Sequence, residues 1–246
     1  MNENYIRGII KKKNFELDDE YYNSIAALKD LNKLDFNRPV TFFVGENGTG
    51  KSTVLEAIAV AHGFNPEGGS INFNFESKST HSNLYKQLTL VKGAKRPKDG
   101  FFLRAESFYN VATEIDNLND SADVFLDNYG GKSLHKQSHG ESFLSLIQYR
   151  FHGNGLYLLD EPEAALSPQR LLTMLIYINK LVQENSQFII VTHSPILLGY
   201  RDADIYSFDN GEIEKIKYEE TESYFITKTF LDDPDRMLAN LFDNDY

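Results

Sequence analysis

A glycine-rich octapeptide, residues 45–52 (GENGTGKS), narrows the choice of fold sharply. It fits the pattern G-x-x-x-x-G-K-[ST], and an apolar run rich in β-branched and aromatic residues, 40–44 (VTFFV), directly precedes it. This run is typical of a strand buried on both faces. Beyond the octapeptide, apolar residues recur at helical spacing. The sequence therefore predicts a buried strand, a glycine loop and a helix in that order.

The residue types of this loop indicate that it binds phosphate. Glycines let the backbone curl so that successive N–H groups point inward, and the positive end of the following helix favours the same anion. We expect Lys51 to reach the β- and γ-phosphates of a nucleotide and the Ser52 hydroxyl to bind Mg²⁺. The nucleotide-binding residues predicted here are Gly45, Glu46, Asn47, Gly48, Thr49, Gly50, Lys51, Ser52 and Thr53.

Two further apolar runs are followed by side chains that can bind a metal or transfer a proton. Residues 156–159 (LYLL) lead into Asp160 and Glu161, and residues 188–192 (FIIVT) lead into His193. Ligands of open α/β sheets bind at the carboxyl ends of the strands, so these three side chains should lie near the glycine loop. We expect Asp160 to hold Mg²⁺, directly or through water, and Glu161 to orient and deprotonate an attacking water. His193 would lie within reach of a γ-phosphate.

Composition excludes several classes of protein. The chain has 36 acidic and 25 basic residues, a formal charge of −11, which weighs against holding nucleic acid by bulk electrostatics. It has no cysteine, which excludes disulfides and thiol catalysis. The first residues do not form a signal peptide, and no window approaches the roughly 20 apolar residues of a membrane span. A cytoplasmic protein without membrane insertion is expected.

Taken in order, these motifs resemble the ATP-binding cassette (ABC) ATPase family. The phosphate loop is followed by a signature-like segment, Ser138-His139-Gly140-Glu141-Ser142, about 20 residues before Asp160. The acidic motif then runs through Asp160 and Glu161 into PEAALSP, and His193 stands at the place of the family's switch histidine. The resemblance spans roughly residues 5–217, and it rests on four separate motifs in the required order.

The resemblance implies an α/β P-loop NTPase fold. Its sheet is mostly parallel, with an N-terminal antiparallel β part and a short helical insert. Residues 1–246 then form a single ABC-type ATPase domain. A helical subdomain would occupy about 107–137, and a helical tail would occupy about 218–246. ATP and Mg²⁺ are the implied substrate and cofactor.

The signature segment has two compatible interpretations. In ABC ATPases it comes from the other subunit and closes on the γ-phosphate, so Ser138, Gly140 and Glu141 would bind nucleotide across an ATP-dependent homodimer. The same residues also fit an ordinary helix start, with Ser138 as N-cap and Glu141 completing a capping box. Both roles can hold at once.

Several positions depart from the family pattern. His139 replaces a second small residue, Glu141 replaces the usual glutamine, and Ser167 stands where an aspartate is expected. The glutamine of the Q-loop is absent from its expected position, where the chain has Glu106 instead. Glu106 is therefore predicted to touch the metal through water.

Within the family, the chain looks most like small stand-alone bacterial ATPases that share motifs with RecF, chromosome-maintenance and overcoming-lysogenization-defect proteins. About 30 residues separate the Q-loop position from the signature, too few for a coiled-coil arm, and about 50 follow His193, too few for a nuclease domain. Three functions stay open: an ATPase whose dimerisation moves an unknown partner in DNA repair or phage defence, the ATPase subunit of a membrane transporter, and a non-catalytic nucleotide sensor. The sequence does not show whether DNA is bound.

Overall fold

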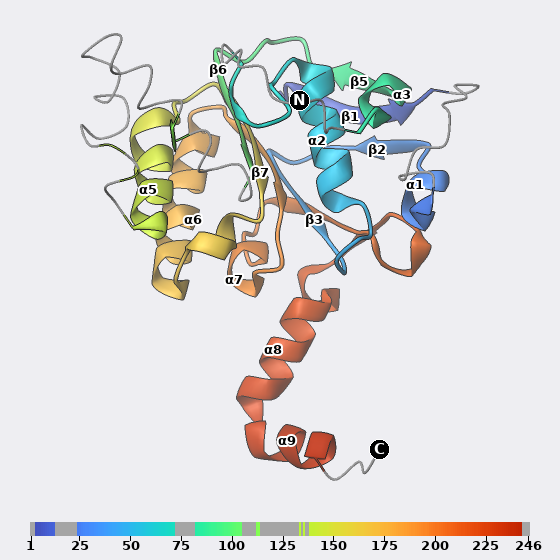
Figure 1. The fold of residues 1–246 in the computed structure, drawn as a ribbon, viewed down its shortest axis with the longest axis vertical. Helices are drawn as coiled ribbons and strands as arrows, with labels where there is room; N and C mark the ends of the chain where they lie inside the picture. Colours follow the sequence, from blue (N-terminus) through green and yellow to red (C-terminus); the bar gives the residue numbers. More distant parts are fainter. Residues whose placement is uncertain are drawn as a thin grey trace.

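The structure, a computed structural model, describes residues 3–12, 24–71, 82–104, 112–113, 133, 135 and 138–242 (Figure 1). The strands are β1 (Ile6–Lys11), β2 (Lys33–Asp35), β3 (Val40–Val44), β4 (Gly69–Ser70), β5 (Leu88–Lys92), β6 (Asp99–Arg104), β7 (Gly155–Asp160), β8 (Gln187–Val191), β9 (Ala203–Ser207) and β10 (Glu214–Ile216). The α-helices are α1 (Ala26–Lys29), α2 (Lys51–His62), α3 (Leu84–Gln87), α5 (His139–Ser145), α6 (Pro168–Gln183), α7 (Pro195–Leu198), α8 (Glu222–Asp232) and α9 (Pro234–Phe242). A π-helix, η4 (Leu146–Arg150), and three 3₁₀ turns, η5 (Pro162–Ala165), η6 (Asp209–Gly211) and η7 (Tyr218–Glu220), complete the described elements.

The larger sheet has the strand order β10-β9-β3-β8-β7-β6-β4 among the described residues. The strands from β9 to β6 run parallel, whereas β10 and β4 pair antiparallel at the two edges. The register pairs Phe42 of β3 with Ile190 of β8, and Ile190 with Leu159 of β7. This topology confirms the predicted mostly parallel α/β sheet.

Helices cover both faces of the sheet. Each strand contributes to both packing layers, because neighbouring side chains along a strand point to opposite sides. Phe42 and Leu159 pack with α5, α6 and α7, while Phe43 and Leu158 pack with α1 and α2. The central strands β3, β7 and β8 are buried along their whole length, except for the intermediate exposure of Asp160. The parallel strands therefore end together at one side of the molecule, which we call the strand-end face.

A second sheet, in the order β2-β1-β5, is antiparallel. It confirms the predicted antiparallel β part, although β5 comes from residues well beyond the phosphate loop. Gln187, the first residue of β8, links the two sheets by hydrogen bonds to β1. Its side-chain nitrogen donates to the Ile6 carbonyl at 2.7 Å, and its side-chain oxygen accepts from the Ile6 N–H at 2.9 Å.

The helix that carries the signature segment changes its winding along its length. It starts as α5 at His139, and its last turn widens into the π-helix η4. In that turn Arg150 donates to both oxygens of Asp99, at 2.8 and 2.9 Å. The predicted helical subdomain, 107–137, lies almost wholly outside the described residues.

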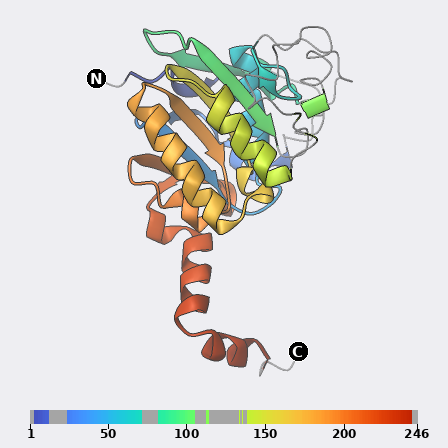
Figure 2. The same ribbon diagram turned by 90° about the vertical axis from the view of Figure 1, so that its left-hand side faces the viewer.

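The helices α8 and α9 project from the body (Figure 1). Figures 1 and 2 show α8 and α9 extending beyond the sheet from the side at which the parallel strands end. Neither helix contains a buried residue. Within the described ranges, no helix is both long and apolar enough to cross a membrane.

Candidate functional site

The phosphate loop joins the end of β3 to the start of α2, as the sequence predicts. Gly50 immediately precedes α2 with φ +98°, a left-handed conformation that glycine adopts without strain. Lys51 is 4% exposed, and its Nζ donates to the carbonyl oxygens of Gly45 and Glu46, each at 2.6 Å. Burial lowers the pKa of the Lys51 ammonium, and the carboxylates of Glu161 and Asp209 partly offset this effect. The loop thus holds one desolvated cation against its own backbone.

Ser52 and Asp160 meet at the end of the sheet. The Ser52 hydroxyl donates to Oδ1 of Asp160 at 2.8 Å, joining the first turn of α2 to the last residue of β7. Two hard oxygen donors in contact fit Mg²⁺, which prefers oxygen and keeps several waters or phosphate oxygens in its shell. The described ranges contain no cluster of three or more acidic, His or Cys side chains suited to a metal. A dication here would therefore need ligands from substrate and water.

Glu161 and His193 face each other beside this pair. Oε1 of Glu161 lies 3.9 Å from Nε2 of His193, and each side chain is 42% exposed. Glu161 has φ +49°, a strained region for a non-glycine residue, and its N–H donates to the Val191 carbonyl at 3.0 Å. The His193 backbone N–H donates to Oε1 of Glu163. Backbone contacts between the ends of β7 and β8 thus fix the two side chains on the strand-end face.

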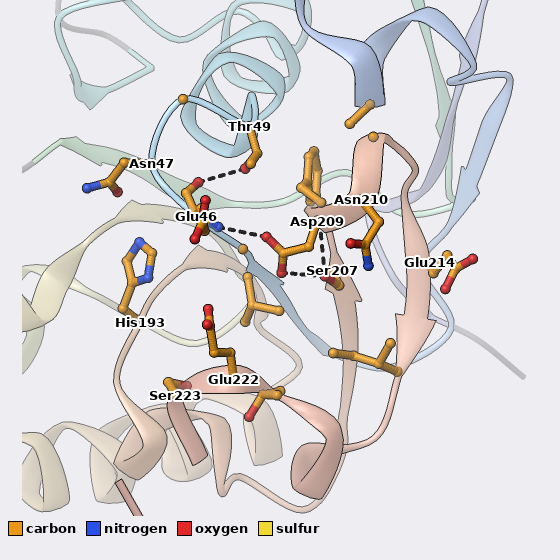
Figure 3. A pocket seen from close by; sticks show the side chains of 18 of the residues that line it. Glu46, Asn47, Thr49, His193, Ser207, Asp209, Asn210, Glu214, Glu222 and Ser223 are labelled. Atoms are coloured by element: carbon orange, nitrogen blue, oxygen red, sulfur yellow. Dashed lines mark hydrogen bonds between the residues drawn. The ribbon is translucent and has the colours of Figure 1, made fainter. Parts of the chain in front are cut away.

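A cleft of about 1110 Å³ opens next to the loop. Its walls come from residues 45–49 of the loop, from His193, from residues 24–27 and from the start of α8 (Figure 3). Thr49 stiffens the loop by donating from its hydroxyl to the Glu46 carbonyl at 2.8 Å. This cleft offers space for the rest of a nucleotide whose phosphates lie on the loop.

Asp209 is a site residue that the sequence interpretation missed. Figure 3 shows its carboxylate pointing at the backbone of Glu46, whose N–H donates to Oδ1 at 2.8 Å. Its other oxygen accepts from the Ser207 hydroxyl at 2.8 Å. A Cβ on Gly45, which has φ +132°, would lie 2.8 Å from Oδ1, so the loop needs glycine there. The one signal in the sequence was the Asn-Gly turn that Asp209 precedes.

The signature segment forms the predicted capping box. The Ser138 hydroxyl and the Ser138 N–H both donate to Oε2 of Glu141, at 2.7 and 3.0 Å. Gly140 packs so closely that a Cβ there would lie 2.4 Å from Nη1 of Arg170 and 2.7 Å from the Ala165 carbonyl oxygen. Packing within the chain is therefore enough to require this glycine.

The structure brings five predicted residues together on the strand-end face: Lys51, Ser52, Asp160, Glu161 and His193. It does not bring the signature segment to the same loop, because α5 and α2 pack on opposite faces of the sheet. Glu106, the predicted water-mediated metal contact, lies outside the described residues.

Three relatives carry names that describe ATP-dependent transport proteins. The xylose/arabinose import ATP-binding protein XylG of Sulfolobus acidocaldarius is 26% identical, over 79% of this chain and 84% of its own length. The probable ATP-dependent transporter ycf16 of Trieres chinensis is 26% identical, over 87% and 92%. The cytochrome c biogenesis ATP-binding export protein CcmA of Legionella pneumophila is 28% identical, over 78% and 96%.

Solved structures with similar chains include an ATP-binding cassette of an ABC transporter in its ADP conformation. That chain is 19% identical, with a TM-score of 0.49 over 92% of this chain and 96% of the other. The SMC head domain from Thermotoga maritima is 16% identical, with a TM-score of 0.42 over 86% and 98%.

The family model AAA_23, described as an AAA domain, matches residues 20–232. This match spans the phosphate loop, the acidic strand end and the histidine, and it stops at the end of α8. The chain therefore belongs to this AAA domain family, among the ABC-type ATPases.

Proposed function

We propose that the chain hydrolyses ATP with Mg²⁺ at a site completed by a second copy of itself. One observation carries the proposal: side chains suited to phosphate binding, metal binding and proton transfer converge where β3, β7 and β8 end. Such convergence at the carboxyl ends of parallel strands is where α/β folds bind ligands.

The loop residues bind the triphosphate. The N–H groups around Gly48 and the start of α2 favour an anion, and Lys51 exchanges its carbonyl partners for phosphate oxygens. The exchange is favourable because phosphate oxygens carry negative charge whereas the carbonyl acceptors are neutral, so the buried ammonium gains the attraction of an opposite charge. Ser52 and Asp160 would hold Mg²⁺, which offsets phosphate charge when bound.

Glu161 is the proposed base and His193 the proposed γ-phosphate contact. The Glu161 carboxylate accepts the proton of the attacking water, while the His193 ring positions the terminal phosphate beside it. Glu163 supports this arrangement because it accepts from the backbone of His193 and so fixes the turn after β8. The proposed site thus has residues for each role: phosphate binding, metal holding and proton acceptance.

A second copy supplies the cap on the γ-phosphate. Within one chain the signature helix α5 lies across the sheet from α2 and its loop, so Ser138 of the same chain is badly placed to close the site. In a two-fold dimer each copy can offer Ser138, Gly140 and the start of α5 to the loop of the other. ATP would then bind the dimer more tightly than the monomer and drive its assembly.

Two kinds of partner could be moved by ATP-driven assembly and disassembly of the dimer. The names of the relatives favour an ATPase subunit that acts with a membrane permease. Glu141 in the signature favours the other setting, DNA repair or phage defence, because it resembles the chromosome-maintenance branch. Purification from native cells discriminates between them: a co-purifying permease supports transport, and a co-purifying nuclease or DNA-bound complex supports the second.

Steady-state hydrolysis tests the catalytic part. Wild-type protein should release phosphate from Mg-ATP, and Glu161→Gln, which keeps the side chain's shape and removes its basicity, should lose at least about a hundredfold in turnover while still binding ATP. Glu184→Gln is the matched control, since Glu184 ends α6 at the far end of the sheet and is exposed. Equal turnover in the wild type and in Glu161→Gln would remove Glu161 from the mechanism.

A further inference from the structure

The tail helices form a C-terminal arm, residues 222–242, which the other residues that the structure describes leave largely exposed. Neither α8 nor α9 buries a single residue, and the arm exposes large apolar side chains. Their exposed fractions are 64% for Phe225, 44% for Ile226, 39% for Phe230, 72% for Leu231, 57% for Leu241 and 76% for Phe242. Helices of 11 and 9 residues are marginal alone in water, so this arm needs a surface to pack on.

The root of the arm is fixed to the body. Thr221, which precedes α8, is 1% exposed, and the rings of Tyr218 and Tyr224 lie 4.6 Å apart. The Tyr218 hydroxyl donates to the Pro195 carbonyl at 2.9 Å, just after the segment that carries His193. The direction of the arm is therefore set by the same turns that shape the candidate site.

The arm stands on the strand-end face. Phe225 and Ile226 line the same cleft as loop residues 45–49 and His193, and Figure 3 shows Glu222 and Ser223 on the wall of the cleft near His193. Beyond its root the arm extends away from the body on this side (Figures 1 and 2). A second copy that brings Ser138 to this face meets the arm.

The signature side of the molecule has a matching apolar strip. Leu172 and Ile176, one turn apart on α6, are 50% and 68% exposed, and Tyr149 of η4 is 44% exposed. Arg170, which packs against Gly140, precedes Leu172 by two residues on α6, so along the helix axis the strip begins within one turn of the signature contact, on the outer face of the helix. In the proposed dimer, closure of the loop of one copy on the signature of the other would place the strip on the side from which the arm extends.

We propose that the arm of one copy packs on the Leu172–Ile176 strip of the second copy, and reciprocally, as a clasp around the nucleotide. The inference rests on the proposed ATP-dependent dimer. A lipid surface is a poorer occupant: the arm carries Glu222, Asp232, Asp233 and Asp235 against Lys228 and Arg236, so its charge is 2 − 4 = −2, which anionic headgroups repel.

Equilibrium dissociation of the dimer tests the clasp. In Glu161→Gln with Mg-ATP, adding Leu231→Glu should raise the dimer dissociation constant at least tenfold, and adding Ile176→Glu should do the same. Ile10→Glu is the control, because Ile10 is 41% exposed on the antiparallel sheet, and it should leave the constant within a factor of two. Circular dichroism checks that each variant keeps its fold, and ATP titration checks that its phosphate loop still binds nucleotide.

An unchanged dimer dissociation constant in Leu231→Glu would overturn the clasp alone. A Glu161→Gln parent that stays monomeric with ATP bound would overturn the proposed dimer and the clasp together.

Crosslinking locates the contact. The chain has no cysteine, so Leu231→Cys gives one labelling site for a benzophenone-maleimide probe. The probe is activated in a mixture of isotopically light and heavy Glu161→Gln protein with Mg-ATP. Light–heavy adducts that map to α6 are the expected result. Adducts within one chain only, or on other parts of the second copy, would overturn the clasp.

Discussion

The strands that lead to the strand-end face and the C-terminal arm are both rich in apolar residues, yet they differ in burial. The strands behind the face, β3, β7 and β8, are buried almost throughout, and the polar side chains Asp160 and Glu161 at the end of β7 contact Ser52 and His193 within the chain. The arm buries no residue. The chain thus buries the strands behind the candidate site within its own core, but it leaves the apolar side chains of the arm exposed.

The largest effect should follow removal of the loop cation. Lys51→Ala should weaken ATP binding at least about a hundredfold, because two charge-assisted contacts to phosphate contribute about 3–5 kcal/mol together. Isothermal titration measures this, with Lys180→Ala as an exposed control on α6. Wild-type affinity in Lys51→Ala would contradict the assignment of the phosphate loop.

The free energy of unfolding should respond differently to substitutions in the buried strands and in the C-terminal arm. Leu158→Ala opens a cavity in β7, where Leu158 is 0% exposed, and should lower the free energy of unfolding by about 2–5 kcal/mol. Leu231→Ala in the arm should change it by less than about 0.5 kcal/mol in the monomer, since Leu231 is 72% exposed. Denaturant unfolding without nucleotide measures both. A large loss in Leu231→Ala would mean that the arm packs on its own body.

The histidine should affect turnover rather than binding. His193→Ala keeps the loop contacts, so ATP affinity should stay within a few fold, while turnover falls about a hundredfold, about 3 kcal/mol in the transition state. Single-turnover hydrolysis with parallel titration separates the two quantities. If turnover stays within a factor of two, His193 has a structural role only.

Asp209 should show the smallest effect. Asp209→Ala removes the acceptor of the Glu46 N–H and should weaken ATP binding about tenfold, about 1–1.5 kcal/mol for one hydrogen bond. Asp209→Asn keeps an oxygen at that position and should recover most of the affinity. Equal affinities in all three proteins would show that the loop keeps its shape without this contact.

How much the sequence could predict depended on how local each feature is. The strand, loop and helix around Lys51 are continuous in sequence, and the strand ends at Asp160 and Val191 follow from apolar runs, so these predictions are confirmed. The contact between Glu46 and Asp209 joins residues 163 positions apart and depends on the pairing of β3 with β9, which no local pattern encodes. The π-helix and the direction of the arm likewise depend on packing between distant segments. The predicted roles of Ser138, Gly140 and Glu141 across a dimer stay predictions.

The mass of Glu161→Gln in solution reports whether two copies of the chain share the ATP site. Size exclusion with light scattering is run with and without Mg-ATP, and nucleotide occupancy is measured on the eluted protein. We expect the mass of one chain, 28.1 kDa, without nucleotide and twice that mass with Mg-ATP. Adding Ser138→Arg should abolish the dimer while ATP binding persists, because a bulky cation would obstruct the cap. A monomer in both runs with ATP bound would contradict the shared site, and a dimer in both runs would contradict its dependence on ATP.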